Sequence, residues 1–342
     1  MALVAAVNVY PIKSCRGLSV KAVVITETGL RWDRQWMVVK ESTGKMISQR
    51  EVGKLALVVP SLPDEALISR ESTQGLLTVE APGMATPLQV PLQLPATPAA
   101  DNMRKVTVWE WTGHGLDEGE QAAAWFTQYL GVPSRLIRYL GNQGTAAAAE
   151  PGAEPVVRPT DPVYAQDSTT AFSDGFPILL ATEAALDDLN KRLAESDGAA
   201  TMAGLLPLPM ARFRPNIILK GTEAWEEDRW RSVLLHPRVK AAGSTKPDVA
   251  GAEMADVVEL ESVKPCSRCK MTTVDPATGS YSQGEPLDIL ATFRSGSQLG
   301  YTTKGFKYAV HFGWNLVPSQ GALGAIISVG DAASFKDTQR SF

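Results

Sequence analysis

The residues best suited to metal or redox chemistry lie in one short segment, Lys264-Pro265-Cys266-Ser267-Arg268-Cys269-Lys270. The segment contains two of the three cysteines in the 342 residues, and basic side chains flank them. A free thiol with an ordinary pKa is only about 3% thiolate at pH 7, whereas nearby positive charge or a bound metal makes it anionic. We therefore expect soft-metal or redox chemistry at this segment.

The spacing of the two cysteines is compatible with three kinds of site. Half of a structural zinc site would need two more ligands, but Cys15 lies far away in the sequence and the histidines stand singly, at His114, His236 and His311. A thioredoxin-like dithiol should begin a helix after a strand, whereas residues 271–274 are predicted to be extended. One thiolate that binds a soft transition metal, while a cofactor supplies the other ligands, fits the segment better.

The residues alone do not decide between Cys266 and Cys269 as that thiolate. Arg268 and Lys270 flank Cys269 directly, and their positive charges favour an anionic sulfur there. Replacement of each thiol singly would separate the two possibilities.

Basic side chains also recur at expected strand ends and turns, beside aromatic rings, prolines or amides rather than in runs of charge. They stand in Tyr10-Pro11-Ile12-Lys13-Ser14-Cys15, in Asp33-Arg34 and in Arg212-Phe213-Arg214-Pro215-Asn216. Arginine suits bidentate recognition of phosphate, and lysine supplies a compact charge. Three or four such groups on one phosphate would hold a cofactor tightly, at about 1.5–3 kcal/mol for each charge-assisted bond. A solvated surface charge is the alternative interpretation for each of them.

Other motifs point to chemistry less strongly. Ser173-Asp174-Gly175-Phe176-Pro177 is a turn that carries a carboxylate, a pattern that also suits a purely structural Asx-turn. The tryptophans fit a core better than a binding surface. The chain has no nucleophile elbow, P-loop or dinucleotide fingerprint, so those classes of enzyme are not indicated.

Length and composition limit the remaining function classes. The length exceeds the usual size of one domain, so we expect two. The formal net charge of -4 argues against a nucleic-acid binder, because phosphate contacts need a basic surface. An odd number of cysteines favours a reducing compartment over a disulfide framework. No apolar run is long enough to span a bilayer and no targeting peptide is recognisable, so we expect a cytoplasmic protein, or a mitochondrial one if a targeting segment is missing.

Hydrophobic patterning predicts an α+β fold that is mostly β. Regularly spaced short strands over residues 1–110 suggest a barrel or sandwich, and further strands are predicted at 216–220, 257–263, 306–312 and 326–329. Helices are predicted over 118–130, after Thr182 and after Glu285-Pro286. Residues 141–159 have little to bury. We predict an N-terminal domain at 1–140, a flexible linker at 141–160 and a second domain at 161–342.

Four of these motifs together resemble a known family, the amidoxime-reducing component proteins, which are molybdenum enzymes of the MOSC superfamily. The motifs are Tyr10-Pro11-Ile12-Lys13-Ser14-Cys15, Asp33-Arg34, Phe213-Arg214-Pro215-Asn216, and Cys266-Ser267-Arg268-Cys269 with Thr272-Thr273-Val274-Asp275-Pro276-Ala277-Thr278-Gly279. Each is weakly specific, but their order and rough spacing match the family over nearly the whole chain. Gly175 and Phe176 differ from the animal proteins, residues 236–255 form an insertion, and the animal membrane anchor is absent, so a plant or algal member is the closer comparison.

The resemblance implies a β-rich N-terminal domain and a MOSC β-barrel with peripheral helices, and the molybdenum cofactor, a molybdopterin without a nucleotide, bound between them. By motif matching, Cys269 would be the thiolate ligand of molybdenum, and Asp174 would lie near the metal. Ser267 would lie beside the cofactor. The residues expected to hold its phosphate and pterin are Lys13, Ser14, Arg34, Arg214 and Asn216.

The function that the resemblance implies is reduction of N-hydroxylated compounds such as amidoximes, hydroxylamines and N-hydroxylated bases, with nitrite reduction to nitric oxide as a second activity. The family draws electrons from NADH through a flavin reductase and cytochrome b5, so both are expected partners. The alternative is a carrier of molybdenum cofactor or persulfide sulfur without turnover. The chain has no pyridoxal-dependent desulfurase domain, which makes that alternative weaker.

Overall fold

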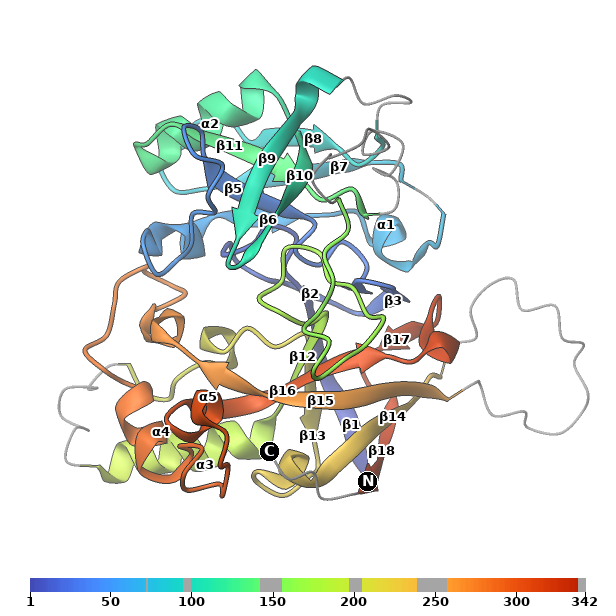
Figure 1. The fold of residues 1–342 in the computed structure, drawn as a ribbon, viewed down its shortest axis with the longest axis vertical. Coiled ribbons are helices and arrows are strands. Elements are labelled where there is room, and N and C mark those ends of the chain that lie inside the picture. The colour runs from blue at the N-terminus through green and yellow to red at the C-terminus, as the bar shows by residue number, and fades with distance from the viewer. Residues whose placement is uncertain (72, 95–99, 142–155, 197–204, 239–256, 338–342) are drawn as a thin grey trace, which may run out of the picture.

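The computed structural model describes residues 1–71, 73–94, 100–141, 156–196, 205–238 and 257–337. Its largest sheet closes into a barrel, in the lower half of Figure 1. The neighbouring strands are, in order, β13 (Ile217–Lys220), β12 (Ile178–Thr182), β16 (Val310–Pro318), β15 (Val258–Arg268), β14 (Trp230–His236), β18 (Ala332–Asp337) and β1 (Ala2–Val9). β1 pairs back to β13 and closes the ring, and β2 (Leu18–Val20) extends the sheet beside β1.

Strand β1 joins the start of the chain to a barrel built otherwise from residues 178–337. Val4, Val7 and Val9 are buried in the barrel core, as expected for a strand with one face inward. β1 and β13 run antiparallel, with Val7 opposite Ile217, so the end of β1 meets the start of β13. This pairing brings the segments that follow β1 and precede β13 to the same place.

The N-terminal half otherwise forms small sheets, two of them in the upper half of Figure 1. One sheet contains β5 (Trp36–Lys40), β11 (Ser134–Arg138), β10 (Trp111–Asp117) and β9 (Met103–Val108), and another contains β6 (Val59–Ser61), β7 (Leu76–Glu80) and β8 (Leu88–Pro91). A third joins β3 (Ala22–Thr26) to β4 (Gly29–Leu30) and to β17 (Ile326–Ser328) from the C-terminal half. Both halves of the chain therefore contribute to that sheet.

Helices cover the outside of these sheets. α2 (Glu120–Leu130) buries an apolar face in the N-terminal core and ends at Gly131, whose φ of 77° is the left-handed conformation that glycine adopts readily. α3 (Glu183–Glu195) begins after Thr182, whose hydroxyl accepts a hydrogen bond from the backbone N–H of Ala185. The other α-helices are α1 (Asp64–Ile68), α4 (Leu287–Phe293) and α5 (Lys304–Lys307). α3, α4 and α5 lie beside the barrel (Figure 1).

Short 3-10 turns complete the fold at Gly53–Leu57, Ala100–Asn102, Met210–Arg212, Glu226–Arg229, Lys270–Thr273 and Gln320–Ala322. The prediction of extended chain at 271–274 is wrong, because Lys270–Thr273 turns immediately after β15. The hydroxyl of Thr272 donates to the carbonyl of Cys269, and that of Thr273 donates to the carbonyl of Lys270. These local bonds compete with strand pairing and stabilise the turn.

The predicted fold class is confirmed: the structure is mostly β, with a closed barrel and peripheral helices. The helices predicted over 118–130, after Thr182 and after Glu285-Pro286 are also present. The strand predicted at 306–312 begins only at Val310, because Phe306 lies in α5. Most of the predicted linker and the centre of the predicted insertion, at 142–155 and 239–255, lie outside the described residues. In the described ranges, none of the helices has the length and hydrophobicity to cross a bilayer.

Candidate functional site

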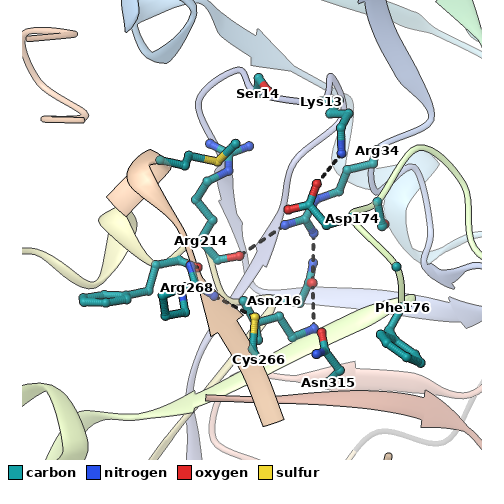
Figure 2. A pocket seen from close by; sticks show the side chains of 15 residues that line it. Lys13, Ser14, Arg34, Asp174, Phe176, Arg214, Asn216, Cys266, Arg268 and Asn315 are labelled. Carbon is teal, nitrogen blue, oxygen red and sulfur yellow. Dashed lines mark hydrogen bonds and ion pairs between the residues drawn. The ribbon is translucent and has the colours of Figure 1, made fainter. Parts of the chain in front are cut away.

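A cleft against the barrel wall gathers residues from segments that are far apart in the sequence (Figure 2). It contains about 570 Å³ of space between protein atoms, part of it open to solvent. The polar and charged side chains that line it are Lys13, Ser14, Arg34, Ser173, Asp174, Arg214, Asn216, Cys266, Arg268 and Asn315. Apolar lining comes from Phe176, Leu179, Phe213 and Met271. Lys13, Ser14, Arg34, Asp174, Arg214 and Asn216 are thus brought together as the sequence motifs suggested.

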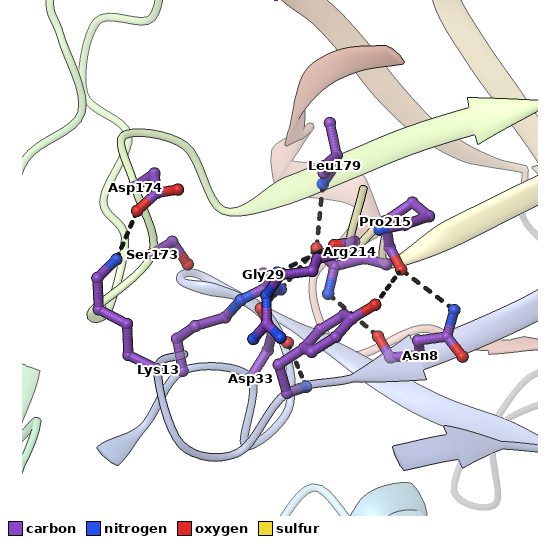
Figure 3. Close-up of polar contacts among 12 residues, drawn as sticks. Asn8, Lys13, Gly29, Asp33, Ser173, Asp174, Leu179, Arg214 and Pro215 are labelled. Carbon is purple, nitrogen blue, oxygen red and sulfur yellow. Dashed lines mark hydrogen bonds and ion pairs between the residues drawn. The ribbon is translucent and has the colours of Figure 1, made fainter. Parts of the chain in front are cut away.

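Lys13 and Asp174 form an ion pair in this cleft, with 2.6 Å between Nζ and Oδ1 (Figure 3). Trp109 donates from Nε1 to the same carboxylate oxygen at 3.3 Å. Burial lowers the pKa of Lys13 to about 8, although the carboxylate of Asp174 opposes that shift. Burial acts to raise the pKa of Asp174, but the charge and hydrogen bond of Lys13 outweigh it and hold that pKa below its usual range. The lysine therefore approaches neutrality at a pH where the carboxylate stays ionised.

Arg34 is held by three partners from two parts of the chain. Its guanidinium donates to the carboxylate of Asp33, to Oδ1 of Asn216 at 2.9 Å and to the carbonyl of Arg214 at 3.2 Å. The carboxylate of Asp33 is 1% exposed and also accepts the backbone N–H of Tyr10 at 2.8 Å. Such a network fixes the direction of the guanidinium before any ligand binds.

The amide of Asn216 is engaged inside the protein. Its oxygen accepts from Arg34 and from the backbone N–H of Leu179 at 3.1 Å, while its nitrogen donates to the carbonyl of Asn8 at 3.1 Å. Asn216 therefore joins β1, β12 and Arg34 in addition to lining the cleft.

Three residues of the cleft have backbones in the left-handed region, where residues other than glycine are uncommon. The φ angles are 66° at Ser14, 46° at Arg34 and 57° at Arg214. Arg214 is further held by a bond from Nη1 to the carbonyl of Cys15 at 2.7 Å. Strained conformations of this kind persist only where the surrounding structure determines them, and they concentrate at functional sites.

Arg158 is a contributor to the site that the sequence motifs did not indicate. It is buried, and it donates to the carbonyls of Ala171 at 3.0 Å, Ser173 at 2.5 Å and Asp174 at 3.0 Å. These bonds shape the turn that presents the Asp174 carboxylate. Arg158 lies in the stretch that was predicted as linker, and no local motif singles it out.

The two cysteines of the C-terminal motif occupy different positions. Cys266 lines the cleft, and its sulfur accepts a bond from Nη1 of Arg268 at 2.9 Å (Figure 2). Burial raises the pKa of Cys266, while the charge of Arg268 opposes the shift. Cys269 is half-buried at the turn after β15, and Ser267 is exposed; neither is among the residues that line the cleft. The Cys269 charge also raises the pKa of Cys266, so the two sulfurs lie within electrostatic range.

The choice of Cys269 over Cys266 as metal ligand stays a prediction. In the described ranges, no three side chains of His, Cys, Asp and Glu cluster as ligands of one metal ion. The zinc interpretation therefore finds no further ligands there. Cys15 is fully buried, and burial raises its pKa to about 12, so it is a poor source of thiolate.

The cleft residues fit an anionic, phosphate-bearing group. Four cations line the cleft, Lys13, Arg34, Arg214 and Arg268, against the single lining carboxylate of Asp174. Buried polar atoms without a partner also lie there, at Ser14 Oγ, Ser173 Oγ and Arg268 Nε. Buried polar groups in native proteins are normally hydrogen-bonded. A ligand with acceptor oxygens would satisfy both the unpartnered donors and the excess positive charge.

Known families match both halves of the chain. The model of the MOSC N-terminal beta barrel domain matches residues 1–133, and that of the MOSC domain matches residues 167–334. A solved structure from Bordetella bronchiseptica is 28% identical and aligns over 33% of this chain and 83% of its own, at a TM-score of 0.25, an overlap too poor to inform the fold.

Curated relatives match over most of their length. Mitochondrial amidoxime reducing component 2 of Rattus norvegicus is 34% identical over 296 residues, which cover 85% of this chain and 72% of the relative. Mitochondrial amidoxime-reducing component 1 is 33% identical in Mus musculus, over 85% of this chain and 71% of the relative, and 31% identical in Homo sapiens, over 85% and 72%. The chain therefore belongs to the amidoxime-reducing component family of MOSC-domain proteins.

Proposed function

We propose that this chain is a molybdenum cofactor-dependent reductase of N-hydroxylated compounds such as amidoximes and hydroxylamines. The relatives are named as amidoxime reducing components, which supports an N-reductive activity. The observation that carries the proposal is the cleft itself, where four cations and unpartnered donors converge beside a thiol. This combination suits a cofactor that has an anionic tail and a soft metal.

The residues have distinct roles in the proposed complex. Arg34, Arg214, Lys13 and Ser14 would bind the phosphate and pterin, because they line the cleft. Cys269 would supply the thiolate to molybdenum, with Cys266 as the competing candidate. When bound, the cofactor supplies two electrons, which with two protons convert an N–OH group to N–H and water. The chain itself fixes the cofactor and limits access to one face.

The Lys13–Asp174 pair is suited to hold a proton beside the reacting group. Lys13 has a pKa of about 8, so it can release a proton near neutral pH, and Asp174, which stays ionised, stabilises the lysine while it is protonated. The ion-paired oxygen also accepts a bond from Trp109, which keeps the carboxylate in one orientation. A positioned acid of matched pKa is what proton delivery to a leaving hydroxyl requires.

Nitrite reduction to nitric oxide is a second candidate activity. The excess of cations over carboxylates in the cleft would attract a small anion, and one electron and two protons convert nitrite to nitric oxide and water. As partners we propose cytochrome b5 and a NADH-dependent flavin reductase. The names of the relatives place them in mitochondria, which supports the mitochondrial alternative for this chain over the cytoplasm.

Elemental analysis and turnover test the proposal together. The protein, produced in a host that makes molybdopterin, should contain about one molybdenum atom per chain and should reduce benzamidoxime with its electron partners. Bound cofactor or persulfide without turnover would favour the carrier alternative. A preparation that retains zinc and no molybdenum would refute the proposal.

A further inference from the structure

Tyr10 lies where two arginines of the cleft, Arg34 and Arg214, meet, although it is not among the residues that line the cleft. Its side chain is 3% exposed, and it follows directly after β1. The guanidinium carbons of Arg34 and Arg214 each lie 4.3 Å from the centre of its ring. A single phenol ring thus contacts two cations that are 180 residues apart in the chain.

The ring stabilises an arrangement that the charges alone would oppose. Arg34 and Arg214 repel each other, and the charge of Arg34 contributes to lowering the pKa of Arg214. The guanidinium of Arg214 contacts the ring and a backbone carbonyl, while that of Arg34 has the buried carboxylate of Asp33. The negative face of an aromatic ring attracts a guanidinium, most strongly where water is excluded. Tyr10 therefore offsets the repulsion between the two arginines.

Tyr10 is itself fixed at both ends. Its backbone N–H donates to Asp33, and its hydroxyl donates to the carbonyl of Pro215 at 3.3 Å. Asp33, Arg214 and Pro215 are labelled in the same view in Figure 3. Because Pro215 follows Arg214 and Asp33 precedes Arg34, the same residue is hydrogen-bonded to a chain neighbour of each arginine.

Gly17 packs directly against the ring. A Cβ atom at Gly17 would lie 2.5 Å from Cε1 and 2.9 Å from Cδ1 and Cζ of Tyr10. The ring cannot move away freely, because it is buried among the arginines and Pro215. Glycine is therefore required here by close approach, and not by an unusual backbone angle.

We propose that Tyr10 is the positioning residue of the anion site. Its ring, which packs against Gly17, holds the guanidinium groups of Arg34 and Arg214 so that both present donors to the cleft. Only the identity of the anion, the phosphate of the cofactor, rests on the proposed function. Tyr10 acts through the two arginines and does not touch the ligand. Loss of the ring removes one contact from both arginines together, whereas loss of its hydroxyl alone leaves the cation–π contacts intact.

The test uses the full chain purified without cofactor and measures how fast phenylglyoxal modifies Arg34 and Arg214, by peptide mass spectrometry. Inorganic phosphate is the probe that protects them. Tyr10→Phe is expected to match the wild type within about threefold, because the ring remains. Tyr10→Leu and Gly17→Ala are expected to react about tenfold faster and to need about tenfold more phosphate for protection.

Gly321→Ala is the matched control, because no other atom lies within 4 Å of the position of its Cβ; it should behave as the wild type. Thermal unfolding identifies any variant that has lost its fold, and if Tyr10→Leu has done so, Gly17→Ala and Tyr10→Phe still decide the proposal. Wild-type reactivity in both ring-perturbed variants would overturn it. If phosphate protects no variant, yet loss of the ring still speeds modification, then the positioning role stands and the proposed anionic cofactor fails.

Discussion

The two sides of the cleft differ in how completely the protein determines them. The arginine side, formed by Arg34, Arg214 and Asn216, has hydrogen bonds, cation–π contacts and left-handed backbones that fix each group. The cysteine side, formed by Cys266 and Arg268, has a bond from Arg268 to the Cys266 sulfur, a second from Arg268 to the carbonyl of Phe213, and an unpartnered Arg268 Nε.

The difference indicates two kinds of recognition. The protein preforms a rigid site for an anion, as expected where binding free energy must not be spent on ordering side chains. The sulfur side retains unused bonding capacity, so its final arrangement depends on the ligand that binds there. Substitutions on the cysteine side should therefore reduce turnover, and substitutions on the arginine side should reduce cofactor retention.

The largest effect is expected on the cysteine side. Replacement of Cys269 by Ala should abolish turnover, because the metal would lose its thiolate, whereas Cys266→Ala should keep much of the activity. Benzamidoxime reduction by the loaded protein measures both. If Cys266→Ala abolished turnover and Cys269→Ala did not, the ligand would be the sulfur that lines the cleft, and the assignment would pass to Cys266.

On the arginine side, Arg214→Ala should reduce cofactor retention by about 10- to 100-fold, since one charge-assisted contact contributes about 1.5–3 kcal/mol. Arg214→Lys should restore little, because an ammonium cannot reproduce the planar fork. Molybdopterin content per chain after gel filtration measures the effect. Arg192→Ala is the control, because Arg192 is a half-exposed residue of α3 that pairs with Asp188. Normal retention in Arg214→Ala would show that this side does not bind the cofactor.

Arg158→Ala should destabilise the turn that presents the Asp174 carboxylate. Removal of the guanidinium leaves three backbone carbonyls without their donor, so the free energy of unfolding should fall by about 1–3 kcal/mol. Urea unfolding measures this loss, and the KM for substrate should rise as Asp174 loses its fixed place. An unchanged unfolding midpoint would mean that water replaces the donor at no cost.

The smallest effect is a dependence on pH through Lys13. Its pKa in the folded protein is about 8, below the ordinary value of 10.5, so the unfolded chain binds more protons between these two values. The free energy of unfolding should therefore rise as pH increases from about 8 to 10.5. Over the same range, kcat/KM should fall as the lysine loses its proton.

Lys13→Arg separates these two consequences. The arginine side chain keeps its charge at all these pH values. The fall in kcat/KM should therefore move to higher pH, and the rise in the free energy of unfolding should disappear. Denaturant unfolding at several pH values, together with the pH profile of benzamidoxime reduction, would show both. The same profile in Lys13→Arg and in the wild type would exclude Lys13 as the titrating group.

Local sequence determined the individual elements. Helix α3 follows from its apolar spacing and the Thr182 cap, and α2 from its buried face and Gly131, since both signals act within a few residues. The residue types of the site could also be identified from the sequence. Thiols beside cations suit soft-metal binding, and arginines suit phosphate binding.

Only the tertiary structure decided which of these residues meet. The pairing of β1 with β13 brings Lys13 and Arg214 into the same cleft, and the contacts of Tyr10 with two distant arginines depend on the same pairing. Which cysteine faces the cleft depends on β15, whose pairing with β16 shifts register between Pro265 and Ser267. Such an irregularity breaks the two-residue alternation of a strand, so the side that a thiol faces cannot be read from its spacing.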